Sequence, residues 1–163
     1  MYEVALVFLG MLVGTLPPWF ARKRRLKTHW CAVRAEIVQC GARAKSVFES
    51  DPLVLSPLYR LPLVAFQASL PVLLADGVLA ESESLVIGRF FSQAQDINRG
   101  LDNAAEMFKS DKEDKLKTEF DRNCLKAKGL VQARNGEKSL YDQAMAIVSR
   151  KISQKWWRYA RHA

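Results

Sequence analysis

The sequence has little of what catalytic and metal sites are built from. Its two histidines, His29 and His162, lie at opposite ends of the chain, with no HExxH or CxxC motif near either. A zinc site needs several such ligands at close spacing, so none is expected. There is no GxSxG motif, and neither histidine has an obvious buried partner for a Ser-His-Asp set. We therefore expect no catalytic, cofactor or metal residue, and a protein that is not an enzyme.

Two partial motifs do not change this expectation. Residues 136–139 (GEKS) resemble the end of a phosphate-binding loop, but the earlier glycine and the preceding strand are missing. Asp76, followed by glycine and then by Glu83, matches the second half of a calcium-binding loop. The positions of the first ligands hold Val72 and Leu74, which cannot bind a hard cation. The segment around Asp76 is therefore expected to be a corner between two helices.

Cysteine is also scarce, and its number is odd: there are three. Cys31 and Cys40 are nine residues apart, which places them on opposite faces of one helix. They cannot form a disulfide with each other without breaking that helix. The sequence therefore indicates a reducing compartment and free thiols.

Excess positive charge is confined to the two ends of the chain. The net charge is +8. Residues 1–30 hold five basic and one acidic residue, residues 31–137 hold fourteen and fifteen, and residues 138–163 hold six and one. Two basic ends on a neutral body favour contact with an anionic membrane surface over a nucleic-acid-binding face, so nucleic acid is not expected as a partner.

The first basic cluster follows a long apolar run. Val4–Phe20 carries no charge, and four of the five residues at 21–25 are Arg or Lys. As a helix, Tyr2–Phe20 spans about 28 Å, close to the hydrocarbon thickness of a bilayer. The marks of a cleaved signal peptide are missing, and a buried core helix would not account for the basic cluster. The sequence predicts a transmembrane anchor at 1–20, a basic juxtamembrane segment at 21–27 and a helical domain at 28–163.

The positive-inside rule places the N-terminus outside and the body in the cytoplasm, as a single-pass protein of the inner membrane. The residues expected at the inner interface are Trp19, Arg22, Lys23, Arg24 and Arg25. Pro17 and Pro18 are expected to end the helix there. Gly10 and Gly14 have the spacing that lets two membrane helices approach closely, so they are candidate self-association residues.

Two heptad seams follow the anchor. The first consists of Leu26, Trp30, Val33, Ile37, Cys40, Ala44 and Val47, and the second of Ile87, Phe90, Ala94, Ile97, Leu101, Ala104 and Phe108. Their matching length predicts an antiparallel pair. A charged helix at about 111–133 and a last helix from about 138 complete an all-α fold, an antiparallel bundle with long coiled-coil-like helices. A polar cluster beside the second seam (Asp96, Asn98, Arg99 and Asp102) is either a solvated face or a set that fixes partner register.

The segment 61–75 is apolar and uncharged. It contains Pro62 and Pro71 and is short for a membrane span. We expect a central core helix that the other helices surround. The alternative is that this segment inserts into the bilayer, as in a membrane-active regulator or a toxin-like protein.

Aromatic and basic residues alternate at the C-terminus. The candidate membrane-interface residues there are Lys155, Trp156, Trp157, Arg158 and Arg161. Rings and cations both favour the interface, and an even number of long antiparallel helices would return this end to the membrane. Stacking on nucleic acid and an ordinary helix end are the alternatives.

Several short motifs between Trp30 and Ala105 carry a resemblance. They are Trp30 with residues 34–37 (RAEI), residues 58–62 (LYRLP), residues 75–79 (ADGVL) and residues 97–101 (INRGL). On them the chain resembles small bacterial single-pass membrane-anchored helical proteins of unknown function. The resemblance implies the architecture and no activity. We therefore expect a non-enzymatic scaffold at the cytoplasmic membrane surface, whose partners are the lipid bilayer and either another protein or a second copy of itself.

Overall fold

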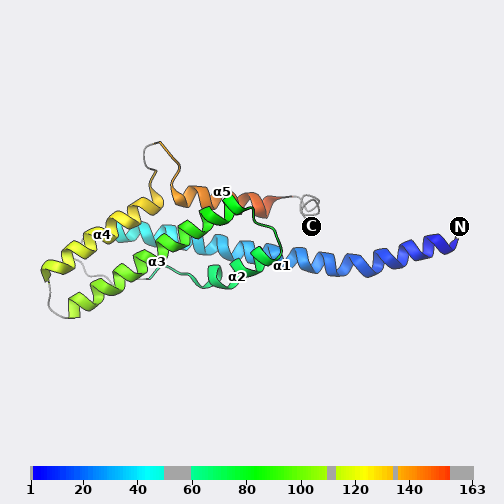
Figure 1. Cartoon of the computed structure of the whole chain (residues 1–163), viewed down its shortest axis with the longest axis horizontal. Coiled ribbons are helices and arrows are strands. Elements are labelled where there is room, and N and C mark those ends of the chain that lie inside the picture. Colours follow the sequence, from blue (N-terminus) through cyan, green and yellow to red (C-terminus); the bar gives the residue numbers. More distant parts are fainter. Residues whose placement is uncertain (1, 50–59, 110–112, 134–135, 155–163) are drawn as a thin grey trace.

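The computed structural model describes residues 2–49, 60–109, 113–133 and 136–154. These ranges form five helices, so the predicted all-α class is confirmed. The helices are α1 (Tyr2–Glu49), α2 (Val64–Ala75), α3 (Glu81–Lys109), α4 (Glu113–Val131) and α5 (Leu140–Ser153). Figure 1 shows an elongated bundle from which the first half of α1 projects.

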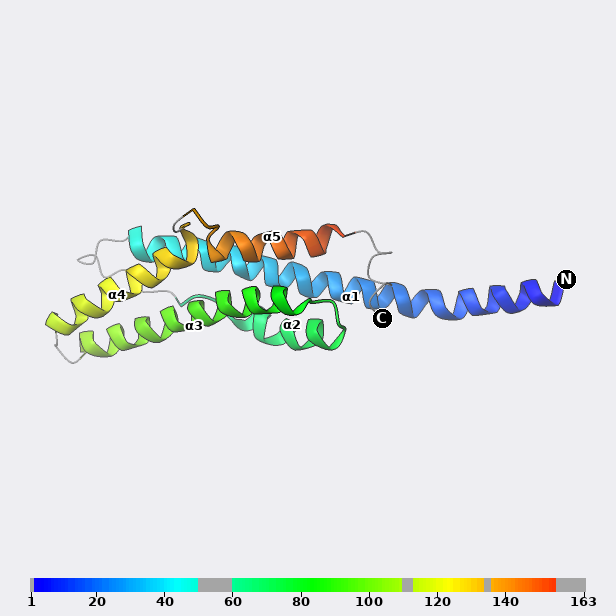
Figure 2. The ribbon, with the colours of Figure 1, turned by 45° about the horizontal axis from the view of Figure 1, so that its top comes forward.

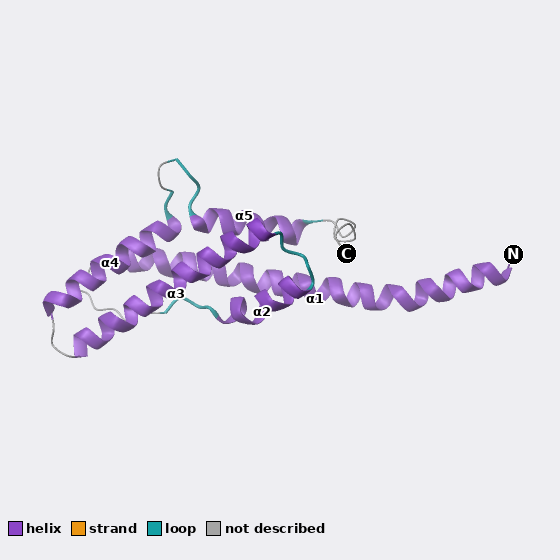
Figure 3. Ribbon diagram, in the orientation of Figure 1, coloured by secondary structure: helices purple, strands orange, loops and turns teal. Residues whose placement is uncertain are grey.

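Helix α1 does not end at Pro17 and Pro18, as the sequence analysis predicted. It continues without a break for 48 residues. A proline fixes φ near −65°, which is itself a helical value, so the helix can continue through both prolines. Each proline removes one N–H donor, and its ring crowds the carbonyl four residues earlier, at Val13 and Gly14, which favours a bend there. The residues before the prolines and the packed part of α1 therefore belong to one continuous helix (Figure 3).

Over the residues that the structure describes fully, no helix is both long enough and apolar enough to cross a bilayer. Most of the predicted anchor lies outside this set, because the side chains of residues 2–9, 12–13 and 15–17 are not described. The division of the chain at residues 20 and 27 stays a prediction.

The first heptad seam is the core face of α1. All seven of its residues, from Leu26 to Val47, are buried. Helices α2, α4 and α5 pack directly against α1. In the second seam the six residues from Ile87 to Ala104 are buried as well, while the side chain of Phe108 lies outside the described residues. Both seams were therefore identified correctly from their spacing.

The expected antiparallel pairing of the two seams is wrong. Figures 1 and 2 show that α1 and α3 run in the same direction, because α2 carries the chain back before α3 begins. Helix α3 packs chiefly on α4, its antiparallel neighbour in sequence, and also on α5. Helices α4 and α5 then run in series, back toward the end at which α1 leaves the body.

Helix α2 is not the central core helix that was expected. It lies on the outside of the bundle, against α1 (Figure 2). Only Ser69 and Leu73 are buried among its residues, and Val64 is 77% exposed. Phe66 stacks on Phe91 of α3, with ring centroids 4.0 Å apart. An apolar segment of this composition was expected at the centre, but the two long seams already fill the core.

Helices α3 and α4 approach each other closely at Gly100. A Cβ atom at this position would lie 1.8 Å from Oδ1 of Asn123 on α4. Asn123 is fully buried, and neither polar atom of its side chain has a hydrogen-bond partner among the described residues. A buried amide without partners costs about 1–3 kcal/mol per group. The close contact of α3 with α4 therefore depends on a glycine. The unpaired amide of Asn123 makes this contact locally unfavourable in free energy.

We predict that Gly100→Ala destabilises the protein by about 2 kcal/mol, because the new methyl group must displace Asn123 or move α4. The double variant Gly100→Ala/Asn123→Ala should recover most of this loss, since it removes both the clash and the unpaired amide. Chemical denaturation of the full chain measures both effects.

Gly88 on the same helix provides the control. A Cβ atom there would meet no other atom within 4 Å. Gly88→Ala should therefore raise stability by about 0.5–1 kcal/mol through helix propensity. Equal stability of the Gly88→Ala and Gly100→Ala variants would contradict the prediction.

Candidate functional site

The candidate site is the end of the body at which α1 leaves it. Two ion pairs join α1 to the corner between α2 and α3. Arg22 donates through Nε to Oδ1 of Asp76 at 3.0 Å and through Nη2 to the Asp76 carbonyl at 3.3 Å. Arg25 donates through Nη2 to Oδ2 of the same carboxylate at 3.1 Å. Asp76 is mostly buried, whereas the two arginines stay about half exposed.

The corner turns at Gly77, whose φ of +64° favours glycine. Helix α3 then begins at Glu81. Glu83 Oε2 accepts a hydrogen bond from the N–H of Ala80 at 2.9 Å. A carboxylate in the first turn satisfies a free N–H and interacts favourably with the helix dipole.

Glu83 also ties the end of α5 to this corner. Arg150 and Lys151 reach its two oxygens at 2.6 and 2.7 Å, and Lys151 donates to the carbonyl of Val78 as well. Burial alone would raise the pKa of Glu83, but the hydrogen bonds from Lys151 and Ala80 and the two positive charges outweigh it, so its pKa is lowered. The last described turn of α5 is thereby fixed at the end where α1 emerges.

The sequence-predicted interface residues fall into two groups. Trp19 packs edge-on against Phe20, and Lys23 Nζ lies 6.0 Å from the centre of the Trp19 ring. Arg24 is exposed on the same part of α1. The C-terminal candidates at 155–161 lie outside the described residues, although α5 ends directly before them.

Among the described side chains, the face of α1 opposite the buried seam is exposed, and many of its residues are small, although Arg24 also lies on it. We call it the outer face, and its members are Gly10, Gly14, Ala21, Thr28, Cys31, Ala35, Val38 and Ala42. They are three, four or seven residues apart. The glycine pair predicted for self-association is therefore the start of a longer surface, which the sequence analysis missed although the same spacing rule would have found it.

A second polar arrangement holds the residues 60–66, which we call the strap. The carboxylate of Glu36 on α1 accepts hydrogen bonds from the N–H groups of Ala65 and Phe66 at 2.8 and 2.6 Å. It thus caps α2 from another helix, because Leu63 at the N-cap position makes no side-chain cap. Missing capping residues before an apolar helix were the only sequence signal for this contact.

Helix α3 holds the strap from the other side. Asn98 accepts from the N–H of Leu61 at 2.7 Å and donates to the Leu61 carbonyl at 2.9 Å. Asp102 pairs with Arg60 at 2.9 and 2.5 Å, while Asp96 pairs only with its own neighbour Arg99. The predicted polar cluster is therefore divided, and two of its four members position a backbone segment of the same chain.

His29 has a buried partner after all, since its Nδ1 lies 3.0 Å from Oγ of Ser69. Ser69 is 2% exposed, so a substrate cannot reach this hydroxyl. Within the described ranges, no group of three or more His, Cys, Asp or Glu residues could hold a metal ion.

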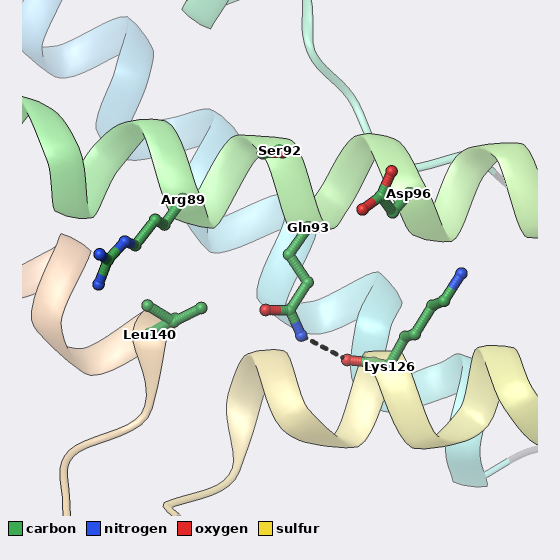
Figure 4. A pocket seen from close by; sticks show the side chains of 6 residues that line it. All are labelled: Arg89, Ser92, Gln93, Asp96, Lys126 and Leu140. Atoms are coloured by element: carbon green, nitrogen blue, oxygen red, sulfur yellow. Dashed lines mark hydrogen bonds between the residues drawn. The ribbon is translucent and has the colours of Figure 1, made fainter.

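An open pocket of about 410 Å³ lies where α3, α4 and the start of α5 meet. Figure 4 shows Gln93 at its centre, donating to the carbonyl of Lys126 at 2.9 Å. Arg89 and the ammonium group of Lys126 point toward opposite ends of the view, so the two cations do not converge on one ligand position. The lining brings no nucleophile and base together; it consists of Arg89, Ser92, Gln93, Asp96, Lys126 and Leu140.

Cys40 gives a test of how tightly the strap is packed. Its thiol donates to the carbonyl of Pro62 at 3.2 Å, and burial, together with the nearby charge of Glu36, raises its pKa to about 12. In the unfolded chain the thiol ionises near its ordinary value of 9.0. Below that pH the shift has no effect on stability. Above it only the unfolded state loses the proton, so stability falls as pH rises toward 12.

We predict that the free energy of unfolding falls by about 1.4 kcal/mol per pH unit more in the wild type than in Cys40→Ala, beginning near pH 9. Denaturant titrations between about pH 8 and pH 10.5 measure the difference, in which the other titrating groups cancel. Cys31→Ala is the control and should follow the wild type, since Cys31 is exposed. Parallel curves for wild type and Cys40→Ala would contradict the burial of this thiol.

Comparisons with known proteins add no relative. No family model, curated protein or solved structure matches the chain. The resemblance to small membrane-anchored bacterial proteins therefore stays a prediction. Two of the motifs that carry it do meet in the structure, because Asn98 holds the backbone of Leu61. What the protein does has to be argued from its own residues.

Proposed function

We propose that this protein is a non-enzymatic, membrane-anchored scaffold whose helical body lies at the cytoplasmic surface of the inner membrane and binds a protein or a second copy of itself. The observation that carries the proposal is the projection of α1. The uncharged run Val4–Phe20 belongs to a helix that extends beyond the bundle instead of folding back onto it (Figure 1).

Water is a poor environment for such a helix. Met11 is 67% exposed and Phe20 57% exposed. Burying one large apolar side chain in hydrocarbon contributes about 1.5–3 kcal/mol, and the run holds many of them. Arg22 to Arg25 follow at once and interact favourably with headgroups on the cytoplasmic side. A bilayer around residues 1–20 therefore satisfies both the apolar run and the basic cluster.

The layout of the body supports the same orientation. The ion pairs of Asp76 and Glu83 gather the ends of α2 and α5 around the point where α1 emerges. The chain after Gln154 therefore starts on the side of the proposed bilayer, and this segment holds Lys155, Trp156 and Arg158. Interfacial rings and cations at both ends of the chain would then contact one membrane surface.

The outer face of α1 is the surface that we propose for self-association. Small side chains let two helices approach closely, both in a bilayer and in water. Apart from Arg24, the face continues from Gly10 and Gly14 in the proposed anchor to Ala42 in the body, so one parallel pair of α1 helices could use most of it. The Cβ positions of both glycines are open, with no atom within 4 Å.

We predict that mild oxidation of the protein in membrane vesicles produces a dimer linked through Cys31, because the two Cys31 residues face each other in a parallel pair. Non-reducing electrophoresis measures the dimer. In a Cys31→Ala background, Ala35→Cys on the outer face should restore the link. Arg34→Cys is exposed but lies about a quarter turn away from that face, so it should not. Equal linking through positions 34 and 35 would indicate random collision instead of a defined pair.

The exposure of α2 keeps a second function under consideration. An apolar helix on the outside of the bundle could enter the bilayer, as in a membrane-active regulator or a toxin-like protein. Against this, Glu36, Ser69 and Asp76 tie both ends and the middle of α2 to α1. Val64 is the position that separates the two functions, because it is exposed in the bundle and would be covered after insertion.

We predict that the full chain stays in the membrane pellet after alkaline carbonate extraction, whereas a chain without residues 2–20 is released. In inside-out vesicles, Val64→Cys in a Cys31→Ala background should react with a membrane-impermeant maleimide. Release of the full chain would contradict the anchor. Retention of the full chain together with protection of the new cysteine would favour insertion of α2 over the scaffold.

A further inference from the structure

Arg22 and Arg25 have more hydrogen-bond donors than Asp76 accepts from. A guanidinium group has five N–H donors. In the described contacts Arg22 uses two groups and Arg25 uses one. Their side chains are 50% and 59% exposed, while that of Asp76 is 14% exposed. One buried carboxylate thus holds two arginines on its outer side, and the trio keeps a net charge of +1.

The surroundings of this trio are basic as well. Arg24 and Lys27 are exposed on the same stretch of α1, and Lys23 lies near the Trp19 ring. Within the described residues, Asp76 is the sole acidic partner of this stretch. The two arginines are three residues apart on one helix, so their guanidinium groups converge on a single anion. Paired guanidinium groups match the oxygens of a phosphate as well as those of a carboxylate.

We propose that Arg22 and Arg25 form a docking site for the phosphate groups of anionic lipids, and that Asp76 occupies this site within the chain. The inference rests on the proposed function, since the anchor brings residues 22–25 to headgroup level. Lipid phosphates then compete with Asp76 for the two arginines. When lipid phosphates displace Asp76, the corner between α2 and α3 loses its ion pairs with α1.

This competition has a structural consequence for the corner. Asp76 follows the last residue of α2, and its backbone N–H is bonded to the Val72 carbonyl. The next two N–H groups, of Gly77 and Val78, are bonded to the carbonyls of Leu74 and Leu73. With the arginines released, these bonds lose the side-chain anchor that holds them against α1. Anionic lipid therefore loosens the side of this corner that faces α1, while the contacts of Lys151 with Val78 and Glu83, and those of the strap, remain.

The test uses the full chain in nanodiscs of phosphatidylcholine alone and of phosphatidylcholine with phosphatidylglycerol. Thermal unfolding is followed by the helical circular dichroism signal. In neutral discs Asp76→Asn should lower the midpoint by about 2 °C relative to wild type, as expected for loss of a surface ion pair. In anionic discs this decrement should disappear, because lipid phosphates already hold the arginines. The same decrement in both discs would overturn the proposal.

Two control variants make the result specific. Asp102→Asn removes a different arginine–carboxylate pair, the one with Arg60, which lies just before the opposite end of α2. Its effect should be equal in both discs. In an Arg22→Gln/Arg25→Gln background, Asp76→Asn should show no lipid dependence. A lipid dependence that persists without the arginines would reflect overall charge and would contradict the site.

Wild-type protein provides a second measurement that needs no substitution. Hydrogen exchange at Gly77 and Val78 should be several-fold faster in anionic than in neutral discs, and unchanged exchange would count against the proposal. Inorganic phosphate at matched ionic strength in neutral discs should have no effect; if it accelerates exchange equally, the site is not a lipid site. Failure of the chain to enter discs at all would instead contradict the proposed anchor.

Discussion

Burial of one face of α1 is the constraint on which the rest of the structure depends. The seam from Leu26 to Val47 is covered by α4, α5 and α2, so the body packs around the long helix. The surface around α1 is limited, and different sides of the helix have different neighbours. The apolar seam faces the core, a polar stripe with Glu36 and Arg25 holds α2, and the outer face is left to solvent. Each neighbouring helix is thereby assigned to one side.

Hydrophobic spacing alone was sufficient to predict much of this. Both heptad seams, the all-α class and the helix at 64–75 follow from periodicity and proline positions, because burial of an apolar face is a property of local sequence. The turn at Gly77 was also predicted, since an Asp-Gly pair favours a positive φ. The basic cluster at Arg22 was predicted to lie at a membrane interface, which stays a prediction, and its pairing with Asp76 was not predicted.

What could not be predicted is which elements meet. Apolarity suggested that α2 is central, but composition does not say whether other segments fill the core first. The direction of α3 relative to α1 depends on the path of the strap and α2 between them, and no periodic pattern in the sequence predicts that path. Polar contacts such as Glu36 with the α2 N-terminus, or Asn98 with Leu61, join residues about thirty positions apart. Such contacts depend on tertiary geometry and leave only faint traces in single-residue patterns.

The continuity of α1 through Pro17 and Pro18 has a geometric consequence. Each residue of an α-helix turns the next by about 100°. In an unbroken helix, the face that carries Gly14 keeps a fixed rotation relative to the face that carries Leu26, set by the number of residues between them. A contact that the outer face makes within the proposed bilayer would therefore determine which side of the helical body faces the bound partner.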